Sequence, residues 1–93
     1  MSNYKNEYLD NFFELMRKER EYAAQWGDDF DAKNTPNDWV AYVTRYLGQT
    51  VTMPWDAKKF KEQMVKTATL CASAVEWCDR TNGDMAKRHY DKD

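Results

Sequence analysis

The sequence predicts an all-α fold, a three-helix bundle-like domain over residues 1–83 with a polar tail over 84–93. Two long stretches predict it, because their apolar residues recur at spacings of three and four. A shorter stretch between them carries helix signals at both ends. Strand signals are lacking, since the best candidate, 49–53, is short and has no second segment to pair with. The tail has no apolar periodicity, and we expect it to be frayed.

The first helix is predicted over residues 3–25. One wide apolar stripe defines its core-facing side, formed by Tyr8, Phe12, Leu15, Tyr22 and Trp26. Gly27 is expected to end this helix, and residues 27–34 are expected to form a loop. The acidic residues of the loop do not fit a calcium-binding EF-hand, because a lysine falls at a ligand position and no closing glutamate follows. Asp28 or Asp29 is expected to cap local backbone amides instead.

The second helix is predicted over residues 36–47 and carries the clearest local signals of the chain. Thr35 is the expected N-cap, a proline takes the first helical position, and Asp38 can reach back to the free amides. Gly48 is expected to end the helix in the left-handed conformation. Trp39 comes directly after the cap, and we expect it to pack in the core.

The third helix is predicted over residues 56–80, with Asp56 as its N-cap and residues 81–83 as its end. Its core-facing stripe is expected to be Ala57, Phe60, Met64, Ala68, Cys71, Val75 and Cys78. Leu70, Ala74 and Trp77 widen this stripe, so we expect neighbours to cover the helix on two sides. A second face, expected to be solvated, carries Lys59, Glu62, Lys66, Thr69, Ser73 and Arg80.

The apolar composition predicts a small core and self-association. The chain has four Leu, five Val and no Ile, whereas it has six Tyr, four Trp, four Phe and five Met. A small domain with so few aliphatic residues can complete its core by forming a homo-oligomer. Its formal net charge of −2 argues against a protein that binds duplex nucleic acid through phosphate contacts, because such a protein needs a basic face.

Cysteine spacing and the N-terminus point to a cytoplasmic protein. Cys71 and Cys78 fall on one predicted helix about 10 Å apart along its axis, too far to form a disulfide with each other. With no second cysteine pair, we expect the reducing cytosol. The first residues contain no apolar run typical of a signal peptide, and no stretch has the length of apolar residues that a membrane span requires.

Two acidic residues one helical turn apart, Glu76 and Asp79, suggest an alternative with bound Mg²⁺. Helical bundles hold this ion with paired carboxylates on facing helices. The plainer interpretation is surface charge, since Glu76 lies four residues before Arg80, the spacing of an ordinary helix ion pair. The sequence therefore predicts no metal, with Mg²⁺ as the alternative.

Glu19 falls on the predicted core-facing stripe of the first helix, where an unpaired carboxylate is costly. Either it lies at the edge of the stripe and pairs with Arg20 or Arg45, or it binds a cation or the amine of a ligand. Both interpretations fit the sequence.

A small anionic ligand with a flat ring fits the remaining polar and aromatic residues. Arg45 and Lys66 are the cations that would meet phosphate groups. Tyr42, Tyr46 and Trp77 offer faces on which a base can stack. The alternative is that these residues form an ordinary solvated face. No glycine-rich phosphate loop and no nucleophile with a histidine partner points to catalysis.

Four segments of the sequence are similar to segments of known proteins. They are 37–43 with Tyr46 and Gly48, 65–70, 74–76 with 79–80, and Glu19-Arg20 followed by 26–29. Over roughly residues 17–80 they resemble short phage and prophage proteins of unassigned function. Such proteins are sometimes grouped with the MazG-like all-α nucleotide pyrophosphohydrolases, which implies Mg²⁺ chemistry through Glu76, Asp79 and Glu19. This chain lacks the tandem Glu-x-x-Glu carboxylates that precede the final Glu-x-x-Asp in that enzyme pattern.

The function that follows is an expectation with one alternative. The resemblance implies a small phage-type protein of the host cell cytosol, and such proteins often counter host defence. We therefore expect a non-enzymatic binding protein that sequesters a nucleotide-like ligand or blocks a host protein. The alternative is a MazG-like Mg²⁺-dependent nucleotide pyrophosphohydrolase.

Overall fold

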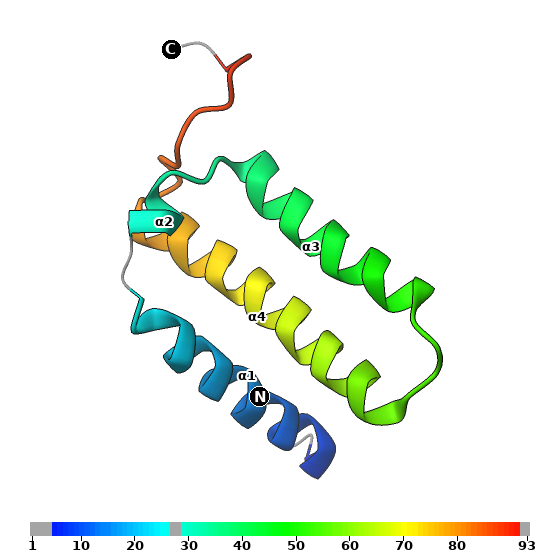
Figure 1. Ribbon diagram of the computed structural model, residues 1–93. Coiled ribbons are helices and arrows are strands. Elements are labelled where there is room, and N and C mark those ends of the chain that lie inside the picture. The colour runs from blue at the N-terminus through cyan, green and yellow to red at the C-terminus, as the bar shows by residue number, and fades with distance from the viewer. Residues whose placement is uncertain (1–4, 27–28, 92–93) are drawn as a thin grey trace.

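A single layer of three long helices makes up the fold (Figure 1). The computed structural model describes residues 5–26 and 29–91. Its helices are α1 (Glu7–Ala24), the single turn α2 (Asp29–Ala32), α3 (Pro36–Thr52) and α4 (Ala57–Arg80). Helix α4 lies in the middle of the layer and packs against α3 on one side and α1 on the other. The described residues contain no strand, so the predicted all-α class is confirmed.

Local capping fixes where the helices begin. At α3 the Thr35 hydroxyl accepts from the Asp38 N–H at 3.3 Å, and the Asp38 carboxylate accepts from the Thr35 N–H at 2.9 Å. At α4 the Asp56 carboxylate accepts from two amides, at 3.0 and 3.1 Å. Both predicted N-caps are confirmed. Helix α1 begins after Asn6, whose side chain accepts from the Leu9 N–H. The predicted start at residue 3 lies outside the described residues.

The predicted end of the second helix is wrong, because α3 continues through Gly48 to Thr52. Gly48 sits inside the helix without a positive φ angle, and a Cβ added there would meet nothing within 4 Å. The helix stops where Met53 becomes extended, at φ −80° and ψ 144°. This is the conformation that a following proline imposes, so Pro54 ends the helix.

The end of α4 follows its predicted signal. Asn82 and Gly83 have positive φ angles of 54° and 82°, and the Gly83 N–H donates to the Cys78 carbonyl at 2.8 Å. This left-handed pair closes the helix as a terminal glycine does. Helix α1 ends at Ala24 with Gln25 as its C-cap. The predicted stop at Gly27 and the predicted cap by Asp28 fall outside the described residues. The predicted loop over 27–34 includes α2, and the predicted cap by Asp29 involves a side chain outside the described ones.

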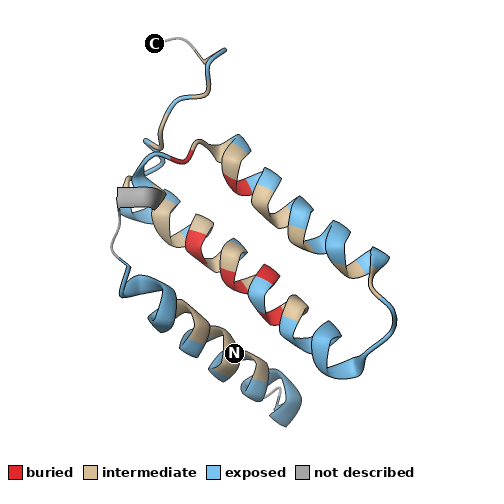
Figure 2. Cartoon of the chain, in the orientation of Figure 1, coloured by how far each residue is buried: buried red, intermediate tan, exposed pale blue. Residues whose placement is uncertain are grey.

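The hydrophobic core of the described residues is small. Trp39 and Val65 are its buried hydrophobic side chains, 4% and 8% exposed. Trp39 therefore packs in the core as predicted. The buried polar residues Thr67, Thr69 and Ser73 lie on α4, and each hydroxyl donates to a carbonyl one turn earlier. In Figure 2 the buried residues lie on α4 and around the start of α3, whereas α1 carries none.

The stripes predicted to face the core on α4 and on α1 need correction. On α4, Phe60, Cys71, Val75 and Cys78 are exposed, whereas Thr69 and Ser73, from the face expected to be solvated, are buried. On α1, Tyr8, Tyr22 and Trp26 are 87%, 60% and 74% exposed, and only Phe12 and Leu15 of that stripe are half-buried. These side chains are exposed because the helices form a single layer. Neighbouring helices cover two opposite sides of α4 and one side of α1, and the most apolar side of each helix is left without a neighbour.

The predicted tail contains no helix over the described residues 84–91, and it extends beyond the end of the layer (Figure 1). The Arg88 guanidinium donates to the Asp91 carboxylate at 2.8 and 2.7 Å and lies 4.7 Å from the centre of the Tyr90 ring. The Tyr90 hydroxyl accepts from the Asn37 side chain at 2.9 Å. This contact joins the tail to the first turn of α3.

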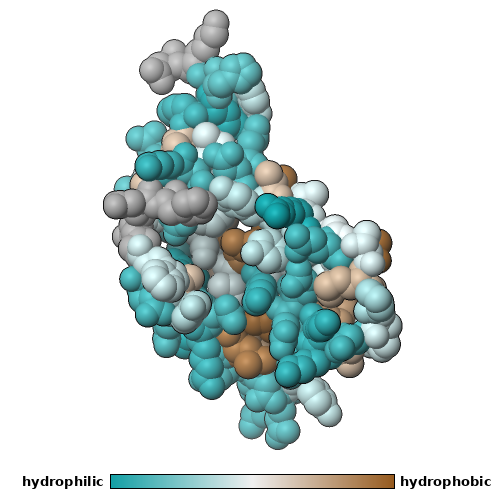
Figure 3. Space-filling model, viewed as in Figure 1, coloured by the Kyte–Doolittle hydropathy of each residue, from teal (hydrophilic) through white to brown (hydrophobic). Residues whose placement is uncertain are grey.

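Within the described residues, none of the helices combines the length and the apolar character needed to cross a membrane. The face seen in Figure 3 is largely hydrophilic, with hydrophobic residues gathered near its middle and at one edge.

Candidate functional site

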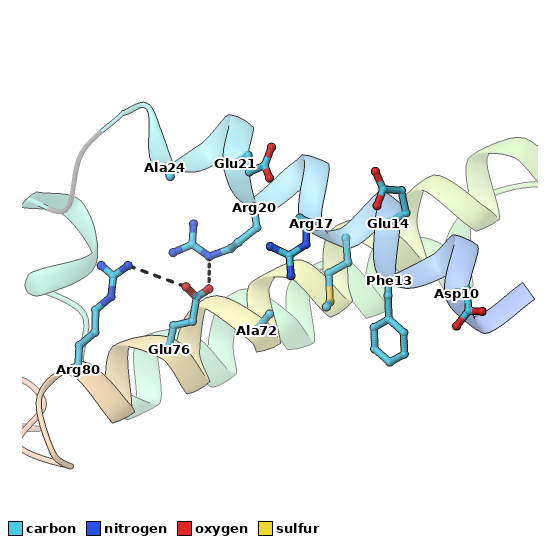
Figure 4. A pocket seen from close by; sticks show the side chains of 11 residues that line it. Asp10, Phe13, Glu14, Arg17, Arg20, Glu21, Ala24, Ala72, Glu76 and Arg80 are labelled. Atoms are coloured by element: carbon cyan, nitrogen blue, oxygen red, sulfur yellow. Dashed lines mark hydrogen bonds and ion pairs between the residues drawn. The ribbon is translucent and has the colours of Figure 1, made fainter. Parts of the chain in front are cut away.

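A cleft of about 570 Å³ lies between α1 and α4 (Figure 4). We call it the arginine cleft and define it by Arg17, Arg20, Glu76 and Arg80. Glu76 reaches from α4 toward α1, where its carboxylate accepts from the Arg20 Nε at 2.5 Å. Its other oxygen lies 3.9 Å from the Arg80 guanidinium, one turn along α4. Two cations therefore hold one carboxylate across the two helices.

The partners of Glu76 determine what this carboxylate can do. The predicted pair with Arg80 is confirmed, and Arg20 adds a stronger partner from a different helix. The two guanidiniums place positive charge beside the Glu76 carboxylate, and this charge opposes the binding of Mg²⁺ there. Arg20 pairs with Glu76, so the predicted alternative of an Arg20–Glu19 pair is wrong.

A second groove runs along the other side of α1. It has a volume of about 270 Å³, and we call it the aromatic groove. All three long helices contribute side chains to it, namely Glu19, Tyr22, Trp26, Tyr46, Lys66, Thr69 and Ser73. The two grooves use opposite sides of α1, because positions 17 and 20 point about half a turn away from positions 22 and 26.

The walls of the aromatic groove are rings and its floor is polar. Tyr22 and Trp26 pack edge to face, with centroids 6.1 Å apart and an interplanar angle of 88°. Tyr46 faces the same space from α3. The hydroxyls of Thr69 and Ser73 donate to backbone carbonyls, so they offer acceptor lone pairs to a ligand.

The aromatic groove continues into a larger hollow of about 710 Å³ that shares Glu19, Tyr22 and Lys66 with it. Lysines dominate this hollow, with Lys18, Lys58, Lys61 and Lys66 against Glu19 and Glu62. The combined groove thus presents flat rings at one end and a cluster of cations at the other.

Three of the six ligand-binding residues predicted from the sequence meet in this groove. Glu19, Tyr46 and Lys66 come from three different helices and line one space. The other three lie outside its lining. Arg45 is exposed on α3, Tyr42 is half-buried, and the Trp77 ring lies 6.0 Å from the Arg80 guanidinium. Arg45 is separated from Tyr46 by about 100° around α3, which explains why the two do not share the groove.

Sequence reasoning missed the contribution of Tyr22, Trp26 and the lysines. Tyr22 and Trp26 were assigned to the core because they are spaced by four on an apolar stripe. Such spacing shows that two rings share a face, but not whether another helix covers that face. Lysines at 58, 61 and 18 become neighbours only because α1 and α4 pack side by side.

The predicted metal-binding carboxylates do not converge. Glu76 lines the arginine cleft, Glu19 lines the aromatic groove, and Asp79 is exposed at the end of α4. Among the residues that the structure describes, no three His, Cys, Asp or Glu side chains are grouped so that they could hold a metal ion.

Comparison with known proteins gives no relative, since no family model, curated protein or solved structure matches the chain.

Proposed function

We propose that this protein is a non-enzymatic binding protein, and that the aromatic groove takes a nucleotide-like ligand, an anion that carries a flat ring. The observation that carries the proposal is the meeting of Glu19, Tyr46 and Lys66 from three helices in one groove beside Tyr22 and Trp26. Each residue type has a role in such a complex. A ring can stack on the tyrosines, while the lysines face the phosphate groups.

The energies of these contacts are sufficient for a useful site. Stacking on one aromatic side chain contributes about 1–3 kcal/mol per base. A charge-assisted hydrogen bond contributes about 1.5–3 kcal/mol. The carboxylate of Glu19 and the acceptor oxygens of Thr69 and Ser73 suit ligand amines or sugar hydroxyls.

Biological context comes from the resemblance to short phage proteins. On that ground the proposal is a phage-type protein that counters host defence, either by sequestering the ligand or by blocking a host protein in the host cytosol. The proposal includes self-association, because the described residues bury only two hydrophobic side chains, Trp39 and Val65.

A nucleotide panel tests the ligand. Thermal unfolding and calorimetric titration would be measured with mono-, di- and cyclic nucleotides. Lys66→Gln is expected to weaken binding about 10- to 100-fold, because it removes one charge-assisted contact. Lys59→Gln, on the same helix and outside the groove lining, is the matched control. Arg45→Gln shows whether the arginine preferred from the sequence contributes from its place outside the groove.

Two results would redirect the proposal. If no nucleotide at millimolar concentration shifts the unfolding transition of the wild type, the ligand is wrong and a protein partner becomes the better candidate. If Mg²⁺ and nucleoside triphosphates yield monophosphates, and Glu76→Ala abolishes this, the protein is a pyrophosphohydrolase instead. Asp79→Asn would then show whether the second carboxylate takes part.

A further inference from the structure

The apolar stripe of α4 lies on the open side of the layer. It consists of Phe60, Met64, Ala68, Cys71, Val75 and Cys78, which fall within about 80° of arc around the helix. Phe60 and Val75 are 42% and 60% exposed, and both cysteines are exposed. Helices α1 and α3 pack on the sides of α4 that carry Glu76 and Gln63, so they leave Met64 and Ala68 half-buried and the other four stripe residues exposed.

Apolar surface continues from the stripe onto α3. Leu47 and Val51 are 43% and 84% exposed, and they line a shallow hollow together with Phe60 and Met64. An apolar surface that spans two helices is typical of a contact with another protein surface.

The chain exposes more surface than a compact monomer of its mass. Its accessible surface is 7689 Å², whereas a folded monomer of 11.1 kDa exposes about 5,700 Å². The excess of about 2,000 Å² is larger than the about 800 Å² that each partner covers in a standard interface. The radius of gyration, 15.4 Å, likewise exceeds the about 12 Å of a compact domain of this length. The extended polar tail contributes to both values, so the surface offered to a partner is the apolar stripe of α4 with its continuation onto α3.

The spacing within the stripe is self-complementary. Met64, Ala68, Cys71 and Val75 are separated by four, three and four residues, a pattern that reads the same in both directions. In an antiparallel pair centred midway between Ala68 and Cys71, Met64 meets the partner's Val75 and Ala68 meets the partner's Cys71. Phe60 meets the partner's Cys78. Larger side chains thus face smaller ones, as knobs-into-holes packing requires.

Charges beside the stripe favour the same arrangement. Lys61 and Asp79 are eighteen residues apart, five complete helical turns, so they lie on one edge of the stripe. Residues on the same edge meet across an antiparallel two-fold axis. Lys61 then faces the partner's Asp79, and symmetry gives this pair twice. A parallel pair would instead place Lys61 and the partner's Asp79 on opposite edges of the interface and at different heights, so they could not pair.

We propose that two copies of this chain pack face to face through the α4 stripe, antiparallel about a two-fold axis between Ala68 and Cys71. This inference rests on the self-association proposed above and names its surface and register. The dimer would place the open sides of two layers against each other and leave the aromatic grooves on the outside.

The two natural cysteines report the register. In the antiparallel pair the two Cys71 residues lie about 5 Å apart along the helix axis, whereas the two Cys78 residues lie about 25 Å apart. We expect Cys78→Ser, which retains Cys71, to form a covalent dimer with oxidant or a short thiol crosslinker. This reaction should be on the order of tenfold faster or more than for Cys71→Ser, which retains Cys78. Equal rates would indicate a parallel pair and overturn the register.

Measurements of the mass in solution test separately whether the chain forms a dimer and whether the dimer uses the α4 stripe. Light scattering of the full chain should give twice 11.1 kDa at micromolar concentration; a mass of 11.1 kDa would overturn both proposals. Val75→Asp should weaken the dimer about a hundredfold or more, because it would bury a charge. Tyr22→Asp, exposed on α1 in the aromatic groove on the outside of the dimer, is the control. A dimer that survives Val75→Asp uses another surface.

Exchanging the charges of Lys61 and Asp79 tests the antiparallel arrangement without changing the apolar side chains of the stripe. Lys61→Glu should weaken the dimer about tenfold, and adding Asp79→Lys in the same chain should restore it. Circular dichroism of each variant shows that the helices are retained. Failure of the second change to restore the mass would overturn the antiparallel arrangement, while leaving the self-association itself in place.

Discussion

Helices α3 and α1 both pack against α4, but the two contacts differ in kind. The α3–α4 contact contains the buried Trp39, and both helices begin at well-formed caps. Helix α1 buries no residue; its half-buried Phe12 and Leu15 line a hollow with Met64 and Val65 of α4, and the Arg20–Glu76 ion pair also joins the two helices. Apolar burial is worth more than a partly exposed ion pair. The difference teaches that the α3–α4 hairpin is the stable unit, whereas α1 is attached to it by weaker contacts.

Removing Trp39 should break the stronger contact. Trp39→Ala is expected to cost about 3–5 kcal/mol of unfolding free energy, because it leaves a cavity in a core of two hydrophobic side chains. Denaturant unfolding measures this cost. Trp26→Ala, just after α1, is the matched control, since its ring is 74% exposed, and it should cost about 0.5–1.5 kcal/mol. Equal losses in the two variants would show that the contacts do not differ as described.

Removing Arg20 should release the weaker contact. Arg20→Met is expected to cost about 1–2 kcal/mol, since it breaks a charged hydrogen bond that is only partly buried. Amide hydrogen exchange should become faster over α1 and stay nearly unchanged over α3 and α4. Arg17→Met is the control, because Arg17 lines the same cleft without pairing with Glu76. Faster exchange spread evenly over all three helices would contradict separate units.

The cap of α3 should have a smaller effect. Thr35→Ala removes the acceptor of the Asp38 N–H and is expected to cost about 1 kcal/mol. Thr52→Ala, at the other end of α3, should change stability little, because its exposed hydroxyl only donates to the Gln49 carbonyl. Thermal unfolding of the two variants compares the ends of one helix. A larger loss at Thr52 would mean that the capping box does not control this helix.

The smallest effect should come from the tail as the pH falls. The Arg88 guanidinium lowers the pKa of the Asp91 carboxyl by hydrogen bonding. Because this pKa is lowered, the Arg88–Asp91 interaction stabilises the turn fully at pH values above the ordinary pKa of an aspartate. The stabilisation is lost as the pH falls through the lowered pKa. Tyr90 resonances should then shift in acid while helix signals stay constant, and Asp91→Asn should show the acid state at neutral pH. A Tyr90 shift in acid that persists in Asp91→Asn would contradict the assignment to Asp91.

Local signals were sufficient for some features and not for others. The caps Thr35 and Asp56 were predicted because the partners of a cap lie within three residues of it in sequence. The end of α3 was misplaced because Gly48 permits a left-handed turn without requiring one, whereas Pro54 acts on the residue before it. Of the candidate site, Glu19, Tyr46 and Lys66 were named from residue type, and their meeting depends on three helices packing together.

The sequence by itself determined the three long helices, the starts of α3 and α4 and the burial of Trp39, since these depend on short-range hydrogen bonds and on apolar periodicity. Only the tertiary structure decided which side of each helix has a neighbour. Periodicity shows that Phe60, Cys71 and Val75 share one face of α4, but a free energy gain from burial is the same whichever surface supplies the cover. The layer places α1 and α3 on the two flanks of α4 and leaves this face exposed within one chain.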